Sequence, residues 1–353
     1  MRWDLKLHGS KSVVNSRQFV TAQNALIAVC DLFAALALWH ACWKLVTIWE
    51  NLNTSAAMRL SVSGFCASVW RQKIMNDLFT VGSLCLRIIW DNCIEIPENF
   101  LKFRGGDTPD YTYTIRVDES FPEPSGKILA RREDLIVAQN QWGECRWIGI
   151  KGNPHFYAYY EETGPESVEI LLRMDLYQRL NCDPVFTSLL ALERRQMARE
   201  ALVLHCAYVE YRNQAILFSA PSETGKTTQG NLWEKYRGAR TVNGDRGLIQ
   251  KLDGRWIVQG WPVCGSSEVC HNEDMPIRAI VMLSQAPEDR AERLSPMKAF
   301  TQIYSQITVN RWNRDANVRT MALLEDLIAE VPVYHLACTM NESAVFVLEA
   351  AIQ

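Results

Sequence analysis

Hydrophobic and polar positions follow different patterns in three parts of this 353-residue chain. In residues 75–174, short β-branched and aromatic runs alternate with Pro, Gly and Asp turns, which is typical of strands. In residues 175–353, runs of strand length alternate with stretches of helical periodicity, which favours an α/β domain. Residues 1–74 are rich in Ala, Leu, Trp and Ser. We therefore predict an α/β (α+β) fold with a β-rich subdomain at 75–174, an α/β domain at 175–353 and a helical extension at 1–74.

The β-rich part carries no residue pattern that indicates chemistry. Its expected strands are 80–90, 111–117, 127–137, 155–161 and 167–172. Its Trp and Tyr residues are expected to pack in the core or on a sheet face. The α/β part is expected to open with one helix that begins at Asp183-Pro184 and continues to about residue 200.

The longest apolar stretch, residues 25–49, has the length of a membrane span, which needs about 20 apolar residues. Asp31, His40 and Lys44 interrupt it, and each of these side chains is costly in lipid. We therefore favour a packed helix or helical hairpin over membrane contact. The chain start lacks the pattern of a signal peptide, and we expect a cytoplasmic protein. Two origins stay open for residues 1–74: an added helical segment, or an extension from a misassigned start before Met75.

Charge and cysteine usage narrow the class of protein. The net charge of -3 and the pI of about 6.1 give no overall basic surface, which disfavours nucleic acid as a partner. The 11 cysteines are scattered, as in a reduced cytosolic protein. Cys264, Cys270 and His271 have the spacing C-x5-C-H but lack a second ligand pair, so we favour buried or loop thiols there over a metal site.

Residues 220–228 (APSETGKTT) form the strongest motif of the chain. An expected strand at 214–218 precedes them and an expected helix at 228–236 follows, which is the order that a Walker A loop requires. Backbone N–H groups and the positive end of the helix would face phosphates. Lys226 would contact the outer phosphates, and the Thr227 hydroxyl would bind Mg²⁺. The residues assigned to nucleotide binding are Ala220, Pro221, Ser222, Glu223, Thr224, Gly225, Lys226, Thr227 and Thr228.

Glu223 is the discordant residue of this loop. Related loops usually carry Gly there, because the backbone bends tightly and presents its N–H, and a carboxylate repels phosphate. Either the side chain points outward at little cost, or nucleotide affinity is reduced. We favour the first alternative, because Ala220, Gly225, Lys226 and Thr227 all remain.

Asp245 follows an expected strand at 240–243. An acidic residue at the end of a neighbouring strand is suited to a second Mg²⁺ contact or to a catalytic base. Alternatively, Asp245 is a turn residue before the hairpin at 248–260, whose Asp253-Gly254 pair is a strong turn signal. We favour the metal or base role.

Together, these motifs resemble a known family. Residues 205–283 resemble the catalytic domain of HPr kinase/phosphorylase and of its relative, ATP-dependent phosphoenolpyruvate carboxykinase. Residues 75–353 look like the HPr-kinase-like proteins found beside modified-peptide biosynthesis genes, including lasso-peptide precursor kinases. The matching stretches are SAPSETGKTTQGNLW, NGDRGLI, GWPVCGSSEVCHN, MPIRAIVML, VNRWN and VPVYHLAC.

The resemblance implies roles for four residues. Lys226 resembles the phosphate-binding lysine and Thr227 the Mg²⁺-binding hydroxyl. His205 lies where HPr kinases have an active-site histidine, although from sequence alone it is more often a core histidine. Asp245 resembles the second member of an Asp-Asp pair that binds metal and activates the acceptor hydroxyl. Gly244 stands at the first position of that pair, which is a departure from the family.

The function expected from these residues is an ATP- and Mg²⁺-dependent kinase that phosphorylates a Ser or Thr of a peptide or small protein. Asp245, with His205, would accept the hydroxyl proton. Arg246, Arg278 and Arg311 are candidates to stabilise the transferred group. The first alternative is a nucleotide-binding regulator or scaffold that has lost catalysis. A carboxykinase ranks last, and a small-molecule kinase stays open, as does a homo-oligomer.

Overall fold

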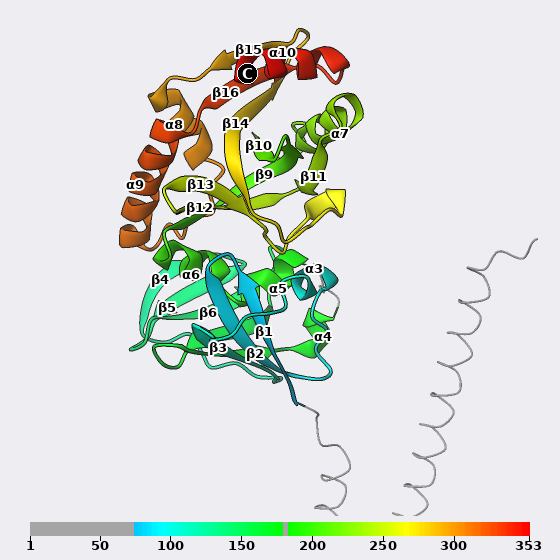
Figure 1. Cartoon of the computed structure of the whole chain (residues 1–353). Coiled ribbons are helices and arrows are strands. Elements are labelled where there is room, and N and C mark those ends of the chain that lie inside the picture. The colour runs from blue at the N-terminus through cyan, green and yellow to red at the C-terminus, as the bar shows by residue number, and fades with distance from the viewer. Residues whose placement is uncertain (1–73, 179–182) are drawn as a thin grey trace, which may run out of the picture. The chain divides into compact units, whose positions relative to one another are not determined.

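The computed structural model describes residues 74–178 and 183–353. They form a mixed α/β fold with two eight-stranded sheets (Figure 1). The expectations for residues 1–73, including those for the apolar segment 25–49, lie outside the described residues. In the part of the chain that is described, no helix is long and apolar enough to cross a membrane.

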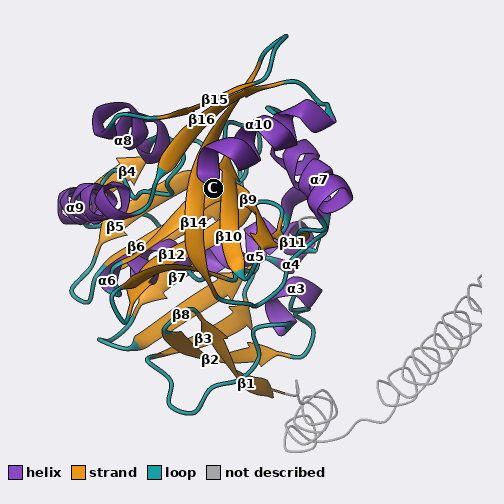
Figure 2. Ribbon diagram, turned by 45° about the horizontal axis from the view of Figure 1, so that its top comes forward, coloured by secondary structure: helices purple, strands orange, loops and turns teal. Residues whose placement is uncertain are grey.

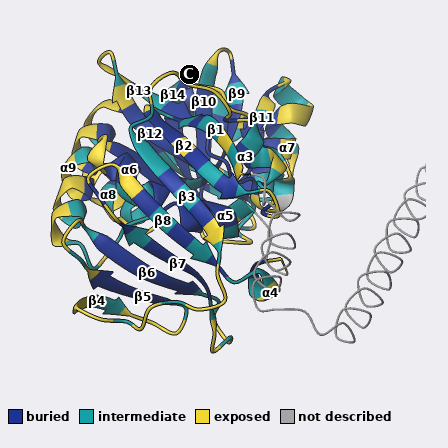
Figure 3. Cartoon of the chain, turned by 90° about the horizontal axis from the view of Figure 1, so that it is seen from below, coloured by how far each residue is buried: buried dark blue, intermediate teal, exposed yellow. Residues whose placement is uncertain are grey.

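The first sheet has the strand order β1-β2-β3-β8-β7-β6-β5-β4. Its strands are β1 (Ile74–Val81), β2 (Leu84–Asp91), β3 (Tyr111–Val117), β4 (Lys127–Arg131), β5 (Leu135–Gln139), β6 (Glu144–Gly149), β7 (Phe156–Glu162) and β8 (Ser167–Leu172). β3 lies parallel to β2 and β8, and the other neighbours are antiparallel. Figure 3 shows that β6 and β7 are largely buried, whereas β8 alternates between buried and more exposed residues. Residues of β2, β3, β7 and β8 pack in one core cluster with residues of α5 and the second sheet.

Two strand predictions in this sheet were too long. The expected strand 80–90 is the end of β1 and most of β2, joined by a tight turn at Gly82 and Ser83. Gly82 has a φ of 60°, which glycine adopts without steric cost. The expected strand 127–137 is likewise divided into β4 and β5, whereas the strand at 111–117 has the predicted bounds.

The helix expected from Asp183 to about residue 200 is two helices. α5 (Asp183–Leu189) and α6 (Leu192–Ala198) are separated at Ala191, which has a left-handed φ of 48°. The physical reason is burial: Leu189, Leu190, Ala191 and Leu192 are all fully buried. One amphipathic helix turns some of four consecutive residues toward solvent, whereas a break lets all four enter the core.

The second sheet has the strand order β10-β9-β12-β13-β14-β16-β15, with β11 paired to β9. Its strands are β9 (Ala201–Tyr211), β10 (Gln214–Ser219), β11 (Arg240–Asn243), β12 (Arg246–Leu252), β13 (Arg255–Gln259), β14 (Met275–Gln285), β15 (Arg290–Arg293) and β16 (Val333–Cys338). β10 also pairs with β14, so β10, β14 and β16 are parallel neighbours in that order. The carboxyl ends of these three strands therefore meet at one edge.

Helices cover both faces of the second sheet. The remaining helices are α3 (Glu98–Leu101), α4 (Met174–Tyr177), α7 (Lys226–Arg237), α8 (Pro296–Tyr304), α9 (Arg314–Glu330) and α10 (Glu342–Ile352). Leu217 of β10 packs in the cluster that holds α8 and α9, whereas the next residue, Phe218, packs in the cluster of α7 and α10. This alternation is the period of two of a buried strand. Figure 2 shows the two helix pairs on either side of the strands.

Candidate active site

The loop predicted to bind phosphate connects β10 to α7. Gly225, with a φ of 115°, immediately precedes the first helical residue, Lys226. Glu223 is exposed and has a φ of 64°, so the loop bends through a left-handed conformation at the position where glycine was expected. The twelve-residue helix α7 thus begins directly behind the loop, and the N–H groups of its first turn have no partner within the helix.

Lys226 is folded back onto its own loop. Its Nζ donates hydrogen bonds to the carbonyl oxygens of Ala220 (3.0 Å) and Pro221 (3.2 Å). Burial lowers the pKa of the ammonium, and the negative charge of Asp245 acts in the opposite direction. The lysine is therefore held inside the loop, with Asp245 as its charge partner across the site.

The pairing of β9 with β12 and β10 brings His205 and Asp245 to this loop. Along β9, His205 is paired with Arg246 of β12, whereas the next residue, Cys206, is paired with Ser219 of β10. β10 and β12 pair with opposite edges of β9, and the site lies at these residues, where the pairing with β10 ends and the pairing with β12 begins. Ser219 donates from Oγ to the carbonyl of His205 (2.8 Å), and the N–H of Cys206 donates to the carbonyl of Asp245 (2.9 Å).

Asp245 lies between two basic side chains. Its Oδ1 is 3.5 Å from Nε2 of His205, and its Oδ2 accepts a hydrogen bond from Nε of Arg246 (3.1 Å). Burial alone would raise the pKa of the Asp245 carboxyl, but the hydrogen bond with His205 and the charges of Arg246 and Lys226 outweigh it. The resulting pKa is below the usual value, so Asp245 is a carboxylate at neutral pH.

Asn243, which the sequence analysis did not select, shapes the turn that carries Asp245. It is fully buried, and its Oδ1 accepts hydrogen bonds from the N–H groups of Asp245 (2.8 Å) and Arg246 (2.9 Å). Its Nδ2 donates to the carbonyl of Trp261 (2.9 Å). The turn is therefore fixed from inside, in the manner of an Asx turn.

The segment from Gln306 to Thr308 supplies two further residues that the sequence analysis missed. Gln306 accepts at Oε1 from Nδ1 of His205 (3.3 Å), and its Nε2 donates to Ser305, which fixes the orientation of the amide. Thr308 accepts at Oγ1 from Arg246 (2.9 Å). Since Gln306 is 101 residues from His205, no local motif reveals this contact.

These elements enclose a cavity of about 310 Å³, which we call the central cavity. The residues that line it are His205, Ser222, Glu223, Gly225, Lys226, Thr227, Thr228, Gly244 and Asp245. Three predicted site residues do not line the central cavity. The carbonyls of Ala220 and Pro221 accept hydrogen bonds from Lys226, which does line it, and Thr224 lines an adjoining cavity. His205, Lys226, Thr227 and Asp245 are thus brought to one place.

The central cavity has donors that suit Mg²⁺ in the presence of a phosphate ligand. Thr227 offers a hydroxyl and Asp245 a carboxylate, and both line the cavity. Mg²⁺ prefers oxygen ligands and is usually held by one or two carboxylates together with substrate phosphates and water. The residues present therefore fit a magnesium–nucleotide complex.

The other arginines considered above have different surroundings. Arg278 donates to Gln214 and to the carbonyl of Ile352, at the amino end of β10 rather than at its carboxyl end. Arg311 is exposed and does not line the central cavity. Arg246 is therefore the one arginine of the three that contacts Asp245.

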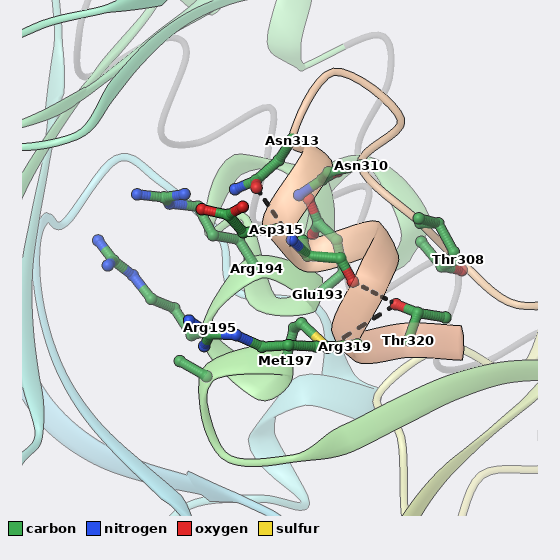
Figure 4. Close-up of a pocket in the computed structure, with 13 residues that line it drawn as sticks. Glu193, Arg194, Arg195, Met197, Thr308, Asn310, Asn313, Asp315, Arg319 and Thr320 are labelled. Atoms are coloured by element: carbon green, nitrogen blue, oxygen red, sulfur yellow. Dashed lines mark hydrogen bonds between the residues drawn. The ribbon is translucent and has the colours of Figure 1, made fainter. Parts of the chain in front are cut away.

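A second cavity, of about 240 Å³, lies between α6, α9 and the segment before α9 (Figure 4). Thr320 donates from Oγ1 to the sulfur of Met197 (3.8 Å) across it. Thr308 lines this cavity and also accepts from Arg246, so Arg246 connects its wall to Asp245. None of the residues that the sequence analysis assigned to the site lines this cavity.

The chain has little detectable similarity to known proteins. No known protein family and no curated protein matches the sequence. Among solved structures, the chain is similar to the Hpr(Ser) kinase/phosphatase from Coxiella burnetii, with a TM-score of 0.26 and 9% sequence identity. The match covers 42% of this chain and 95% of that chain.

Proposed function

We propose that this chain is an ATP-dependent kinase that transfers the γ-phosphoryl group to a Ser or Thr hydroxyl of a peptide or small protein. One observation carries the proposal: a glycine-lysine-threonine loop at a helix start shares the central cavity with an ionised carboxylate. The loop is suited to bind phosphate groups, and the carboxylate is suited to accept the proton of the attacking hydroxyl. Phosphoryl transfer depends mainly on positioning of the reactants and on stabilisation of the charge on the phosphates.

Several residues of the central cavity would bind the phosphates and Mg²⁺. Lys226 exchanges its two loop carbonyls for phosphate oxygens, and the N–H groups at the start of α7 bind the same anion. Bound Mg²⁺, held by Thr227 and Asp245, would neutralise charge on the phosphates. Arg246 adds positive charge beside the carboxylate.

The phosphoryl group is transferred by an in-line displacement. The acceptor hydroxyl oxygen forms a bond to the γ-phosphorus, the bond from that phosphorus to the β,γ-bridging oxygen breaks, and ADP leaves. The hydroxyl proton passes to the carboxylate of Asp245. His205, held between Gln306 and Asp245, orients that carboxylate.

The test uses the full chain, Mg-ATP and Ser/Thr-containing peptides, including any encoded beside the gene, with mass spectrometry for added phosphate. We expect phosphorylation that Lys226→Ala abolishes. Lys235→Ala, at an exposed position of the same helix, is the matched control and should stay active. Asp245→Asn should bind ATP but lose transfer by at least about a hundredfold.

A second candidate is a nucleotide-binding regulator without turnover. Two features favour it: the carboxylate of Glu223 at the phosphate loop, and glycine at position 244 beside Asp245. ATP binding that Lys226→Ala removes, together with no phosphate transfer to any tested peptide, would support the regulator and contradict the kinase. Failure to bind ATP would contradict both.

A further inference from the structure

A third cavity, of about 470 Å³, adjoins the central cavity on the side of β14 and β16, and we call it the lateral cavity. The two cavities share the wall formed by Glu223, Gly225 and Thr228, so they lie on either side of the same loop. Its volume lies within the range of small-molecule sites, which is about 300–1,000 Å³. A ligand seated on the phosphate loop could therefore extend into it.

The place of the lateral cavity in the fold also suits a ligand. It lies beyond the carboxyl ends of three parallel strands, where β10 ends at Ser219, β14 at Gln285 and β16 at Cys338. In open α/β sheets, ligands bind in the crevice outside the carboxyl ends of the strands. The sequence analysis assigned no function to the residues that follow β14 and β16.

The walls of the lateral cavity are fixed in advance. Asp289 accepts hydrogen bonds from the N–H (2.6 Å) and Oγ1 (3.1 Å) of Thr339 and from the hydroxyl of Ser343, which joins the loop after β14 to the loop after β16. Gln285 donates from Nε2 to the carbonyl of Glu223 (3.4 Å), which joins β14 to the phosphate loop. Such preorganisation reduces the entropy lost when a ligand binds.

Gln229 lies in the wall of the lateral cavity, and Met340 lies at its rim. Gln229 is 1% exposed, its Nε2 donates to the carbonyl of Thr339 (3.4 Å), and its Oε1 has no hydrogen-bond partner among the described residues. Because that oxygen has almost no accessible surface, Gln229 contributes to the wall of the cavity rather than a free acceptor. Met340 is 78% exposed at the rim, where a thioether can pack against an aromatic ring.

We propose that the lateral cavity binds the base and ribose of the nucleotide whose phosphates bind at residues 220–228. The base packs against Met340 at the rim of the cavity. The proposal rests on the proposed function in one respect, since it requires that the phosphate loop holds a nucleotide.

The test compares the full chain's binding of Mg-ATP with that of Mg-tripolyphosphate, which has the phosphates without the nucleoside, by isothermal titration calorimetry. We expect ATP to bind at least about tenfold more tightly. Met340→Ala should weaken ATP binding about threefold to tenfold and leave tripolyphosphate binding unchanged. Met297→Ala is the matched control, because Met297 is 76% exposed on α8 and lines neither cavity.

A second variant tests the cavity itself. Ala286→Trp adds bulk to the lateral cavity and should reduce ATP affinity by at least about tenfold. Retained tripolyphosphate binding would show that this variant is folded. Equal affinities for ATP and tripolyphosphate, with no effect of either variant on ATP, would overturn the nucleoside site while leaving the phosphate loop in place. Absence of binding by both ligands would overturn the nucleoside site and the proposed function together.

Discussion

The side chain of Ser267 fills the space that a β-carbon on residue 244 would need, so Gly244 and Ser267 fit each other closely. A β-carbon at 244 would overlap the Oγ and Cβ of Ser267 and lie 3.2 Å from the carbonyl oxygen of Cys264. Ser267 is itself held, because its Oγ donates to that carbonyl (2.7 Å) and accepts from the N–H of Val269 (3.2 Å). The turn therefore has no room for a second carboxylate before Asp245.

This fit predicts a compensating pair of substitutions. Gly244→Ala should lower the free energy of unfolding by about 1–3 kcal/mol, the usual cost of overpacking. Adding Ser267→Gly should recover most of that loss, because it removes the overlapping atoms. Urea denaturation of the two single variants and the double variant measures the coupling between the sites. Additive effects of the two substitutions would contradict the overlap.

Glu223 predicts a gain rather than a loss. Its backbone has a φ of 64°, which is costly for a residue with a β-carbon, and its charge lies on the loop expected to hold phosphate. Glu223→Gly should relieve both effects and tighten ATP binding about threefold to tenfold, as measured by calorimetry. Asp253→Gly is the matched control: Asp253 is also exposed, with a φ of 48°, but lies in the distant β12–β13 turn. Unchanged or weaker ATP binding by Glu223→Gly would contradict this account.

Local signals predicted a hairpin turn and the order of the elements around Lys226. Asp253-Gly254 was expected as a tight turn from its residue types, and both residues have positive φ values. The strand, loop and helix around Lys226 follow in the predicted order, because turn and helix-start chemistry is local. The motif therefore gave the position of the central cavity in the sequence.

Contacts that depend on strand pairing could not be predicted from local signals. The approach of His205 to Asp245 depends on the register between β9 and β12, which no residue type encodes. Gln306 carries no motif and reaches His205 only through the fold. Gly244 reads as a lost carboxylate in the sequence, and only the packing of Ser267 gives it a steric reason.

Gln306 predicts a separation of rate from binding. The side chain of Gln306 positions the imidazole of His205, and the backbone carbonyl of Gln306 accepts a hydrogen bond from the backbone N–H of His205 (3.0 Å). Gln306→Leu keeps the backbone bond and removes the side-chain bond. Under the proposed kinase function, kcat should fall about tenfold while the KM for ATP stays unchanged. Gln302→Leu, on α8, is a control expected to change neither, and a rise in KM alone would contradict the positioning role.

A buried charge network joins the first sheet to α6. Arg146 of β6 lies 2.8 Å from Glu144 and 2.8 Å from Glu193 of α6, and the side chains of Arg146 and Glu144 are at most 5% exposed. Arg146→Met should lower the free energy of unfolding by about 3–5 kcal/mol, because it leaves buried carboxylates short of a partner. Lys251→Met, in the exposed pair with Glu330, should cost less than about 1 kcal/mol. Equal losses in chemical denaturation would contradict the network.

The same network predicts sensitivity to acid. Burial alone would raise the pKa of Glu144, but the charges of Arg146 and Arg194 outweigh it and hold the pKa below its usual value of 4.5. A carboxyl whose pKa is lower in the folded state contributes stability that is fully present above the unfolded pKa and is lost as the pH falls through the folded pKa. The difference in unfolding free energy between the native chain and Glu144→Gln should therefore stay constant from pH 7 to about pH 5 and shrink below about pH 4.5. Urea denaturation at a series of pH values measures it, and a difference that grows on acidification would show that burial, rather than the arginines, dominates at Glu144.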